Sequence, residues 1–232
     1  GARPVGGPVP RVEGRMIPYA NRQRNIARLA LQAAGAHSGF ALAGSGAIRE
    51  HGLIDRPTED VDLFTVQGAV QEFGPALDRI VHGLHEAGYK IDVHERRDSF
   101  ARLSALGSDG VAIELDLGVD WRAQDPVMLD IGPVLSPDDA VGNKTAALFS
   151  RGEARDYLDV DRIRRSGQYT DECLLELAER ADPGFDRKWF AHRLSTVDRL
   201  QQREVEPYGV TPPQLEDIKT RCRSWGKHLH EH

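Results

Sequence analysis

Two aspartates separated by a single residue are the feature of this sequence that most directly suggests chemistry. The segment DVDLF, residues 60–64, alternates polar and apolar residues, which predicts a β-strand. Because side chains at i and i+2 point the same way in a strand, Asp60 and Asp62 share one face while Val61 and Leu63 face the core. Two carboxylates this close repel each other unless a cation lies between them, and Mg²⁺ binds to one or two carboxylates together with phosphate oxygens. The alternative is a solvated edge strand.

A later segment repeats this arrangement. In VAIELDL, residues 111–117, the valine, isoleucine and leucines share one face of a predicted strand, and Glu114 and Asp116 lie on the other. Two acids on an otherwise apolar strand again require a compensating cation or solvent. Either Glu114 or Asp116 would supply a third ligand to a metal held by Asp60 and Asp62, and the alternation does not choose between them.

A Gly-Ser pair upstream of the first acids predicts a phosphate site. The apolar run FALAG, residues 39–43, is typical of a buried strand, and GSGAIREHG, residues 44–52, then begins a short helix. Gly44 allows a backbone to approach a ligand closely, and the free N–H groups at the start of a helix attract phosphate. The Ser45 hydroxyl adds one hydrogen bond, although serine is also a common helix N-cap without any ligand.

Lys144 lies on the apolar side of a later predicted helix. The helix begins at SPDD, residues 136–139, which has serine as N-cap, then proline and two acids. Lys144 follows Val141 by three residues and precedes Leu148 by four, which places it on the apolar stripe. A buried ammonium requires an anionic partner, and the alternative is a lysine that extends to solvent. In the next helix, Asp156 and Asp159 share the inward stripe.

These residues are positioned by elements whose order suggests a small mixed sheet with helices packed on it. The predicted helices are 20–35, 44–52, 68–87, 137–150, 154–166, 171–181, 187–203 and 212–228, and the predicted strands are 39–43, 61–65, 90–95, 100–105 and 110–118. We therefore divide the chain into a flexible N-terminal arm (1–18), a sheet domain (19–134) and a helical domain (135–232).

Composition narrows the class of protein. The 232 residues include 36 acidic and 30 basic side chains, a net charge of −6. This balance argues against indiscriminate nucleic-acid binding, but it permits capture of one RNA end by a local arginine patch. The apolar runs are too short for a membrane span, and the first residues lack the apolar centre of a signal peptide. We expect a cytoplasmic protein without membrane contact.

The order of these motifs resembles the nucleotidyltransferase fold superfamily, with a Gly-Ser turn, an Asp-x-Asp strand and a third acid on a later strand. The segment RPTEDVD, residues 56–62, is more closely similar to the R-x-[ST]-x-D-[IV]-D motif of the AbiEii/MenT-type toxins of type IV-like bacterial toxin–antitoxin systems. The stretch from Lys144 through Arg151 to RDYLD, residues 155–159, resembles the K…R-x-x-D-x-x-D pattern of that family. The resemblance implies an α/β (α+β) fold with a small mixed sheet, followed by a C-terminal helical domain.

The resemblance also implies that Lys144 contacts nucleotide phosphates and that Asp159 or Asp156 completes the site. Together with the strand analysis, it gives three groups of candidate residues. The catalytic group is Asp60, Asp62, Asp116, Lys144 and Asp159; the nucleotide-binding group is Gly44, Ser45, Arg56, Thr58, Lys144 and Asp156; the metal ligands are Asp60, Asp62, Glu114 and Asp116.

The implied activity is Mg²⁺-dependent transfer of a nucleoside monophosphate from an NTP to the 3′ end of tRNA, which blocks aminoacylation and translation. The family further implies a cognate antitoxin, in some members a kinase that acts at the position of Thr58. A phosphate there would add negative charge beside Asp60 and oppose nucleotide binding. The alternatives are an antibiotic-modifying nucleotidyltransferase of the aminoglycoside or lincosamide type and a non-catalytic partner protein on the same fold.

Overall fold

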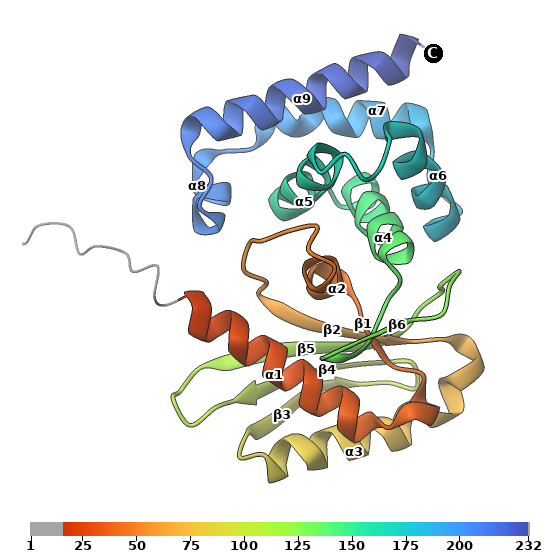
Figure 1. Cartoon of the computed structure of the whole chain (residues 1–232), viewed down its shortest axis with the longest axis vertical. Coiled ribbons are helices and arrows are strands. Elements are labelled where there is room, and N and C mark those ends of the chain that lie inside the picture. Colours follow the sequence, from red (N-terminus) through yellow and green to blue (C-terminus); the bar gives the residue numbers. More distant parts are fainter. Residues whose placement is uncertain (1–15, 232) are drawn as a thin grey trace, which may run out of the picture.

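The computed structural model describes residues 16–231, with side chains from residue 21 onward, as a sheet with helices on both faces (Figure 1). The strands are β1 (Ala41–Leu42), β2 (Asp60–Thr65), β3 (Lys90–Arg96), β4 (Phe100–Leu106), β5 (Ala112–Val119), β6 (Val127–Leu129) and β7 (Gly132–Val134). The α-helices are α1 (Met16–Ala34), α2 (Gly44–Glu50), α3 (Phe73–Glu86), α4 (Pro137–Ser150), α5 (Ala154–Arg165), α6 (Asp171–Ala181), α7 (Arg187–Ser195), α8 (Gln202–Val205) and α9 (Pro212–Glu231). Short 3-10 helices connect several of them.

The strands of the described chain form one mixed sheet in the order β3-β4-β5-β2-β1-β7-β6. The pairs β2–β5 and β1–β7 are parallel, and the other neighbouring pairs are antiparallel. Helices α1 and α3 cover one face, whereas α2 and the helices from α4 onward lie on the other (Figure 1). The predicted α/β (α+β) class with a small mixed sheet is therefore confirmed.

The alternation of β2 decides which residues face which layer. Val61 and Leu63 are 2% and 0% exposed, so the apolar side of β2 belongs to the core beneath the sheet. This core continues into α3, where the side chains of Phe73 and Leu77 are fully buried. Since successive strand residues point to opposite faces, Asp60 and Asp62 lie on the side of α2 and α4.

The helical region departs from the predicted elements at one position. A single helix over 187–203 was expected, but α7 ends at Ser195 and Leu200 is extended before α8 begins. The hydroxyls of Tyr157 and Thr196 both donate to the carbonyl of Arg193, each at 2.7 Å, and so occupy an acceptor at the end of α7. The single helix was therefore a wrong prediction, because one of these contacts comes from Tyr157, 36 residues away along the chain.

Two further differences concern the boundaries of the sheet region. The hairpin of β6 and β7 was not predicted, because each strand has only three residues and Gly132 and Pro133 fall within the second. Helix α1 begins at Met16, so the proposed boundary at residue 18 lies inside a helix. The rest of the predicted arm, residues 1–15, lies outside the described residues.

Candidate active site

The acids predicted on two separate strands are brought together by the pairing of β2 with β5. In the register of these parallel strands, Asp60 lies beside Glu114 and Asp62 beside Asp116. All four line a cavity of about 570 Å³ between the sheet and the N-terminal ends of α2 and α5. The sheet therefore presents four carboxylates on one surface, as the alternation of both segments predicts.

The first residue of α2 packs directly against one of these carboxylates. Gly44 has a φ of +56°, and a Cβ added to it would lie 1.8 Å from Oδ2 of Asp62. The neighbouring Ala43 N–H donates to the Asp62 carbonyl at 2.8 Å, which fixes the start of α2 against β2. Only glycine allows both the left-handed backbone and this close approach. The Gly-Ser turn and the Asp-x-Asp strand thus form one unit in space.

Burial gives Asp62 unusual proton chemistry. Its carboxylate has no hydrogen-bond or ion-pair partner among residues 16–231. Burial, followed by the charges of Asp60 and Asp116, raises the pKa of Asp62 to about 7, while Lys144 and Arg155 partly oppose this rise. A group in this state gains from any cation that enters the cavity, because the cation stabilises the ionised form.

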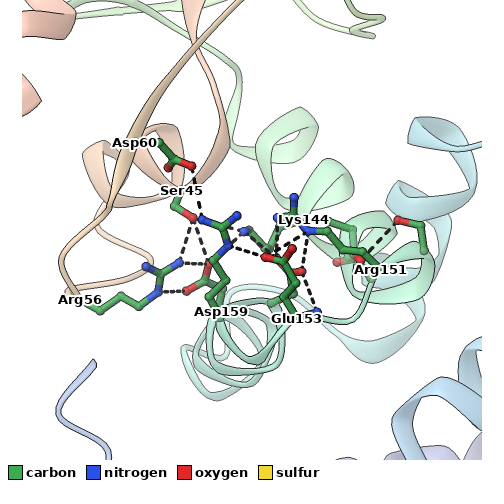
Figure 2. Close-up of polar contacts among 12 residues, drawn as sticks. Ser45, Arg56, Asp60, Lys144, Arg151, Glu153 and Asp159 are labelled. Carbon is green, nitrogen blue, oxygen red and sulfur yellow. Dashed lines mark hydrogen bonds and ion pairs between the residues drawn. The ribbon is translucent and has the colours of Figure 1, made fainter. Parts of the chain in front are cut away.

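Lys144 and Ser45 belong to a buried polar network behind the cavity (Figure 2). The Lys144 ammonium is 5% exposed and lies 3.2 Å from Ser45 Oγ, 3.0 Å from Asp156 Oδ1 and 3.1 Å from Asp159 Oδ2. Arg56 also donates to Ser45 Oγ, at 2.9 Å. The lysine on the apolar stripe therefore has the anionic partners that its burial requires.

Asp156 and Asp159 of α5 are saturated by cations and do not line the carboxylate cavity. Asp159 accepts two 2.6 Å hydrogen bonds from Arg56, and Asp156 accepts bonds of 2.9 and 3.1 Å from Arg151. Burial alone would raise the pKa of Asp156, but the Arg151 hydrogen bond and the Lys144 charge hold it below its ordinary value. Pairing with these cations therefore favours the ionised form of Asp156.

Three arginines that line the cavity, Arg102, Arg151 and Arg155, were not among the predicted site residues. Arg102 of β4 donates two hydrogen bonds, of 2.7 and 2.6 Å, to Asp116. Arg155 donates to Asp60 at 3.3 Å and to Glu153 at 2.8 Å. Alternation of FARLSA could place Arg102 on the polar face of its strand, but only the β4–β5 pairing shows that this face carries Asp116. The sequence therefore indicates the face on which Arg102 lies, but not its partner Asp116.

Thr58 and Arg56 precede the acids on the loop into β2. Thr58 is 4% exposed, and its hydroxyl donates to Gln23 Oε1 of α1 at 2.8 Å. The Arg56 guanidinium lies 5.1 Å from the ring centroid of Tyr208, whose hydroxyl donates to Glu59 at 2.8 Å. The loop is thus held from two sides, by α1 and by the C-terminal helices.

The sheet carboxylates fit a magnesium ion that arrives with phosphate. Within residues 16–231, no group of three or more His, Cys, Asp or Glu side chains is already arranged to hold a metal ion. Mg²⁺ does not require one, because it commonly takes one or two carboxylates and completes its shell with phosphate oxygens and water. Asp60 and Asp62 share a face, and the pKa of Asp62 is raised first by burial and then by the charges of Asp60 and Asp116, which a cation would offset.

The mixed sheet, with acids on β2 and β5 beside a Gly-Ser turn, defines a nucleotidyltransferase-like protein. The family model described as "Nucleotidyl transferase AbiEii toxin, Type IV TA system" matches residues 28–224. The chain therefore belongs to the AbiEii nucleotidyltransferase toxin family. None of the curated proteins matches it significantly in sequence.

Solved structures show the same fold at low sequence identity. A candidate nucleotidyltransferase from H. pylori has a TM-score of 0.57 at 17% identity and covers 91% of this chain and 95% of its own. MenT4, a nucleotidyltransferase toxin from Mycobacterium tuberculosis, has a TM-score of 0.55 at 16% identity, with coverage of 93% and 84%. Among residues 16–231, every helix is too short or too polar to cross a lipid bilayer.

Proposed function

We propose that the chain is a Mg²⁺-dependent enzyme that transfers a nucleoside monophosphate from an NTP to the 3′ end of tRNA, which blocks aminoacylation and hence translation. The observation that carries the proposal is the packing of Gly44 against Asp62. It places a backbone that suits phosphate directly beside a carboxylate that suits a metal. Membership of a nucleotidyltransferase toxin family supports the same activity.

In this proposal Asp60 and Asp62 hold Mg²⁺, which would neutralise the charge of the triphosphate. We favour Asp116 over Glu114 as the third acid, since Asp116 lies beside Asp62 and contributes to its raised pKa. Arg102 and Arg155 now neutralise Asp116 and Asp60. When the triphosphate enters, both arginines are placed to turn from the carboxylates to phosphate oxygens, because these lie in the same cavity.

Lys144 and Ser45 would contact the phosphates from the network behind the cavity. The cations on Lys144, Arg56 and Arg151 pair with Asp156 and Asp159, and Arg151 also lies 3.8 Å from Glu153. Lys144 and Arg151 line the cavity, so both are placed to meet a phosphate there. Asp156 and Asp159 therefore act as positioning residues that hold Lys144 and Arg56 in place.

The transfer itself is a displacement at the α-phosphorus. The 3′ hydroxyl of the acceptor forms a bond to this phosphorus, and the bond to the bridging oxygen breaks, so pyrophosphate leaves. The hydroxyl proton passes to a sheet carboxylate, for which Asp116 or Glu114 is available. Most of the rate enhancement comes from positioning and charge neutralisation, as in other phosphoryl transfers.

A cognate antitoxin completes the proposal, and as a kinase it would act on Thr58. A phosphate at Thr58 would bring negative charge within two residues of Asp60 and oppose the binding of an anionic nucleotide. Because the Thr58 hydroxyl is buried against Gln23, such an enzyme must first open the contact between this loop and α1.

The acceptor is tested with labelled NTPs, Mg²⁺ and total tRNA, in parallel with the same tRNA after periodate oxidation, which destroys the 3′-terminal diol. We expect label on intact tRNA only, no label with EDTA, and none with Asp60→Ala. Equal labelling of oxidised tRNA contradicts transfer to the 3′ end.

The same assay separates the other functions. Label on an aminoglycoside or lincosamide, with none on tRNA, would indicate an antibiotic-modifying enzyme. No transfer to any acceptor, with Asp60→Ala as toxic as the wild type in cells, would indicate a non-catalytic partner protein and overturn both enzymatic assignments.

A further inference from the structure

A second cavity opens directly from the carboxylate cavity. It measures about 350 Å³ and shares four lining residues with its neighbour: Gly44, Asp62, Lys144 and Arg151. From these residues it extends between the end of β2, one side of α4 and the last residue of α6. A molecule whose charged end lies at Asp62 can therefore place its other end here.

The floor of this second cavity is an aromatic ring. Phe64 follows Asp62 by two residues on β2, so its side chain lies on the same face as the acids. Its neighbour across the strand pair is Gly118, where an added Cβ would lie 3.3 Å from two carbons of the Phe64 ring. A side chain at this position would crowd the half-buried ring, which lines the cavity beside Asp62.

Besides Lys144 and Ser150, the wall on α4 carries one more polar side chain, that of Asn143. Asn143 lines the cavity immediately before Lys144, and the other α4 residues of this wall include Ala140, Ala146 and Ala147. The Asn143 amide makes no hydrogen bond to any residue that the structure describes. It therefore offers two donors and one acceptor to whatever occupies the cavity.

We propose that this cavity, the base pocket, holds the base and ribose of the NTP, with the base stacked on Phe64 and its polar edge hydrogen-bonded by Asn143. The inference rests on the proposed function, because it takes the triphosphate to lie at Asp62 and Lys144. An aromatic platform suits the face of any base, while an amide pairs with a donor and an acceptor on its edge. Asn143 is then the residue that selects among NTPs.

The selectivity test uses Asn143→Leu, which keeps the size of the side chain but removes the amide. At saturating tRNA, kcat/KM is measured for ATP, GTP, CTP and UTP. We expect the preference for the best NTP over the worst to fall by roughly 5- to 150-fold, the range for one bidentate contact to a base. Gln168→Leu, a matched change at an exposed position outside the cavity, leaves the preference unchanged.

The stacking test uses Phe64→Leu, which keeps an apolar side chain but loses the flat ring. We expect the KM of all four NTPs to rise by a similar factor of roughly ten or more, since stacking is tolerant of base identity. Phe64→Tyr keeps an aromatic ring, so it should avoid the rise in KM that is expected for Phe64→Leu. Trp189→Leu, at an exposed aromatic residue on α7, controls for the loss of an aromatic side chain elsewhere.

A binding measurement without RNA separates this inference from the proposed function. Each NTP with Mg²⁺ should raise the Tm of the wild type, and this rise should shrink in Asn143→Leu and Phe64→Leu. If the wild type shows these shifts yet labels no RNA, the acceptor assignment fails and the base pocket stands. The base pocket is overturned if both variants keep the NTP preferences and Tm shifts of the wild type. It is also overturned if only the KM for tRNA changes, or if no NTP shifts the Tm of the wild type.

Discussion

Two carboxylates near Lys144, Asp62 on the sheet and Asp156 on α5, differ both in their pairing and in the direction of their pKa shift. On the sheet, Asp62 has no hydrogen-bond or ion-pair partner among residues 16–231, and its pKa is raised to about 7. On α5, Asp156 is 0% exposed, accepts from Lys144 and Arg151, and has a lowered pKa. The residue type is the same, but one carboxylate carries uncompensated charge and the other is fully compensated.

This contrast separates carboxylates that would act in catalysis from carboxylates that stabilise the fold. A carboxylate that is already paired with two cations gains little from a metal, whereas one that repels its neighbours gains much. We therefore expect the sheet acids to control activity with little effect on stability, and the α5 acids to control stability first.

The largest effect is expected for Asp62→Asn, which removes a carboxylate from the proposed metal site. Nucleotide transfer should fall on the order of a thousandfold or more, because charge neutralisation of the phosphates is lost. The Tm should not fall, since no hydrogen bond to the rest of the chain is broken. Label transfer and thermal unfolding on the same preparation check both parts, with the exposed Asp55→Asn as control. A large drop in Tm would contradict the contrast.

The reverse pattern is expected for Asp156→Asn. Loss of this charge leaves Lys144 and Arg151 facing a neutral amide, and breaking a buried pair of this kind costs about 3–5 kcal/mol of unfolding free energy. Urea denaturation measures the loss. Asp198→Asn, which breaks an exposed ion pair with Arg223, should cost less than about 1 kcal/mol. Equal stability of the two variants would show that the α5 network is not structural.

A smaller and pH-dependent effect follows from Asp62. Its pKa in the folded protein, about 7, lies above the ordinary value of 3.8, so the folded state binds this proton more tightly than the unfolded chain. Without metal, the stability that this proton contributes is present at low pH and is lost as the pH rises from about 3.8 through 7.

Asp62→Asn cannot ionise, so its advantage over the wild type should grow across this window and level off above it, at no more than about 4 kcal/mol. Unfolding free energies of both proteins between pH 4 and 8, with EDTA present, test this expectation. A constant difference across the range would show that Asp62 titrates normally. Asp55→Asn, at an exposed carboxylate, should show no comparable trend.

The smallest effects distinguish the two candidates for the third acid. Asp116 lies beside Asp62, whereas Glu114 lies beside Asp60 nearer the exposed end of β5. We expect Asp116→Asn to lower kcat/KM by roughly tenfold to a hundredfold, and Glu114→Gln by less than about threefold. Magnesium titrations of both variants show whether the lower kcat/KM reflects weaker binding of Mg²⁺. The opposite ranking would transfer the third-acid role to Glu114.

The sequence predicts the composition of the sheet surface well because strand alternation is a local property. The period of two places Asp60, Asp62, Glu114 and Asp116 on polar faces without knowledge of the fold. It does not choose between Glu114 and Asp116, because that choice depends on the register of β2 against β5. The same limit hides Arg102, whose partner is defined only by the pairing of β4 with β5.

Helical periodicity likewise predicts that Lys144, Asp156 and Asp159 face inward, but not what they face. The partner of Asp159 is Arg56, which is 103 residues away along the chain. The end of α7 is similarly set by Tyr157, at a distance of 36 residues from Arg193. Such contacts are products of tertiary packing, so a pattern within one helix cannot contain them.

The hydrogen bond between Thr58 and Gln23 has a kinetic consequence. Thr58 is 4% exposed and α1 contacts β2, so its hydroxyl reaches an outside enzyme only during a local opening of the N-terminal helix. If opening is rapid compared with modification, the rate of modification is proportional to the open fraction. A chain whose α1 has not yet docked is therefore modified faster than a mature one. If the proposed kinase acts on Thr58, this contact would favour neutralisation of newly made chains over chains that are already folded.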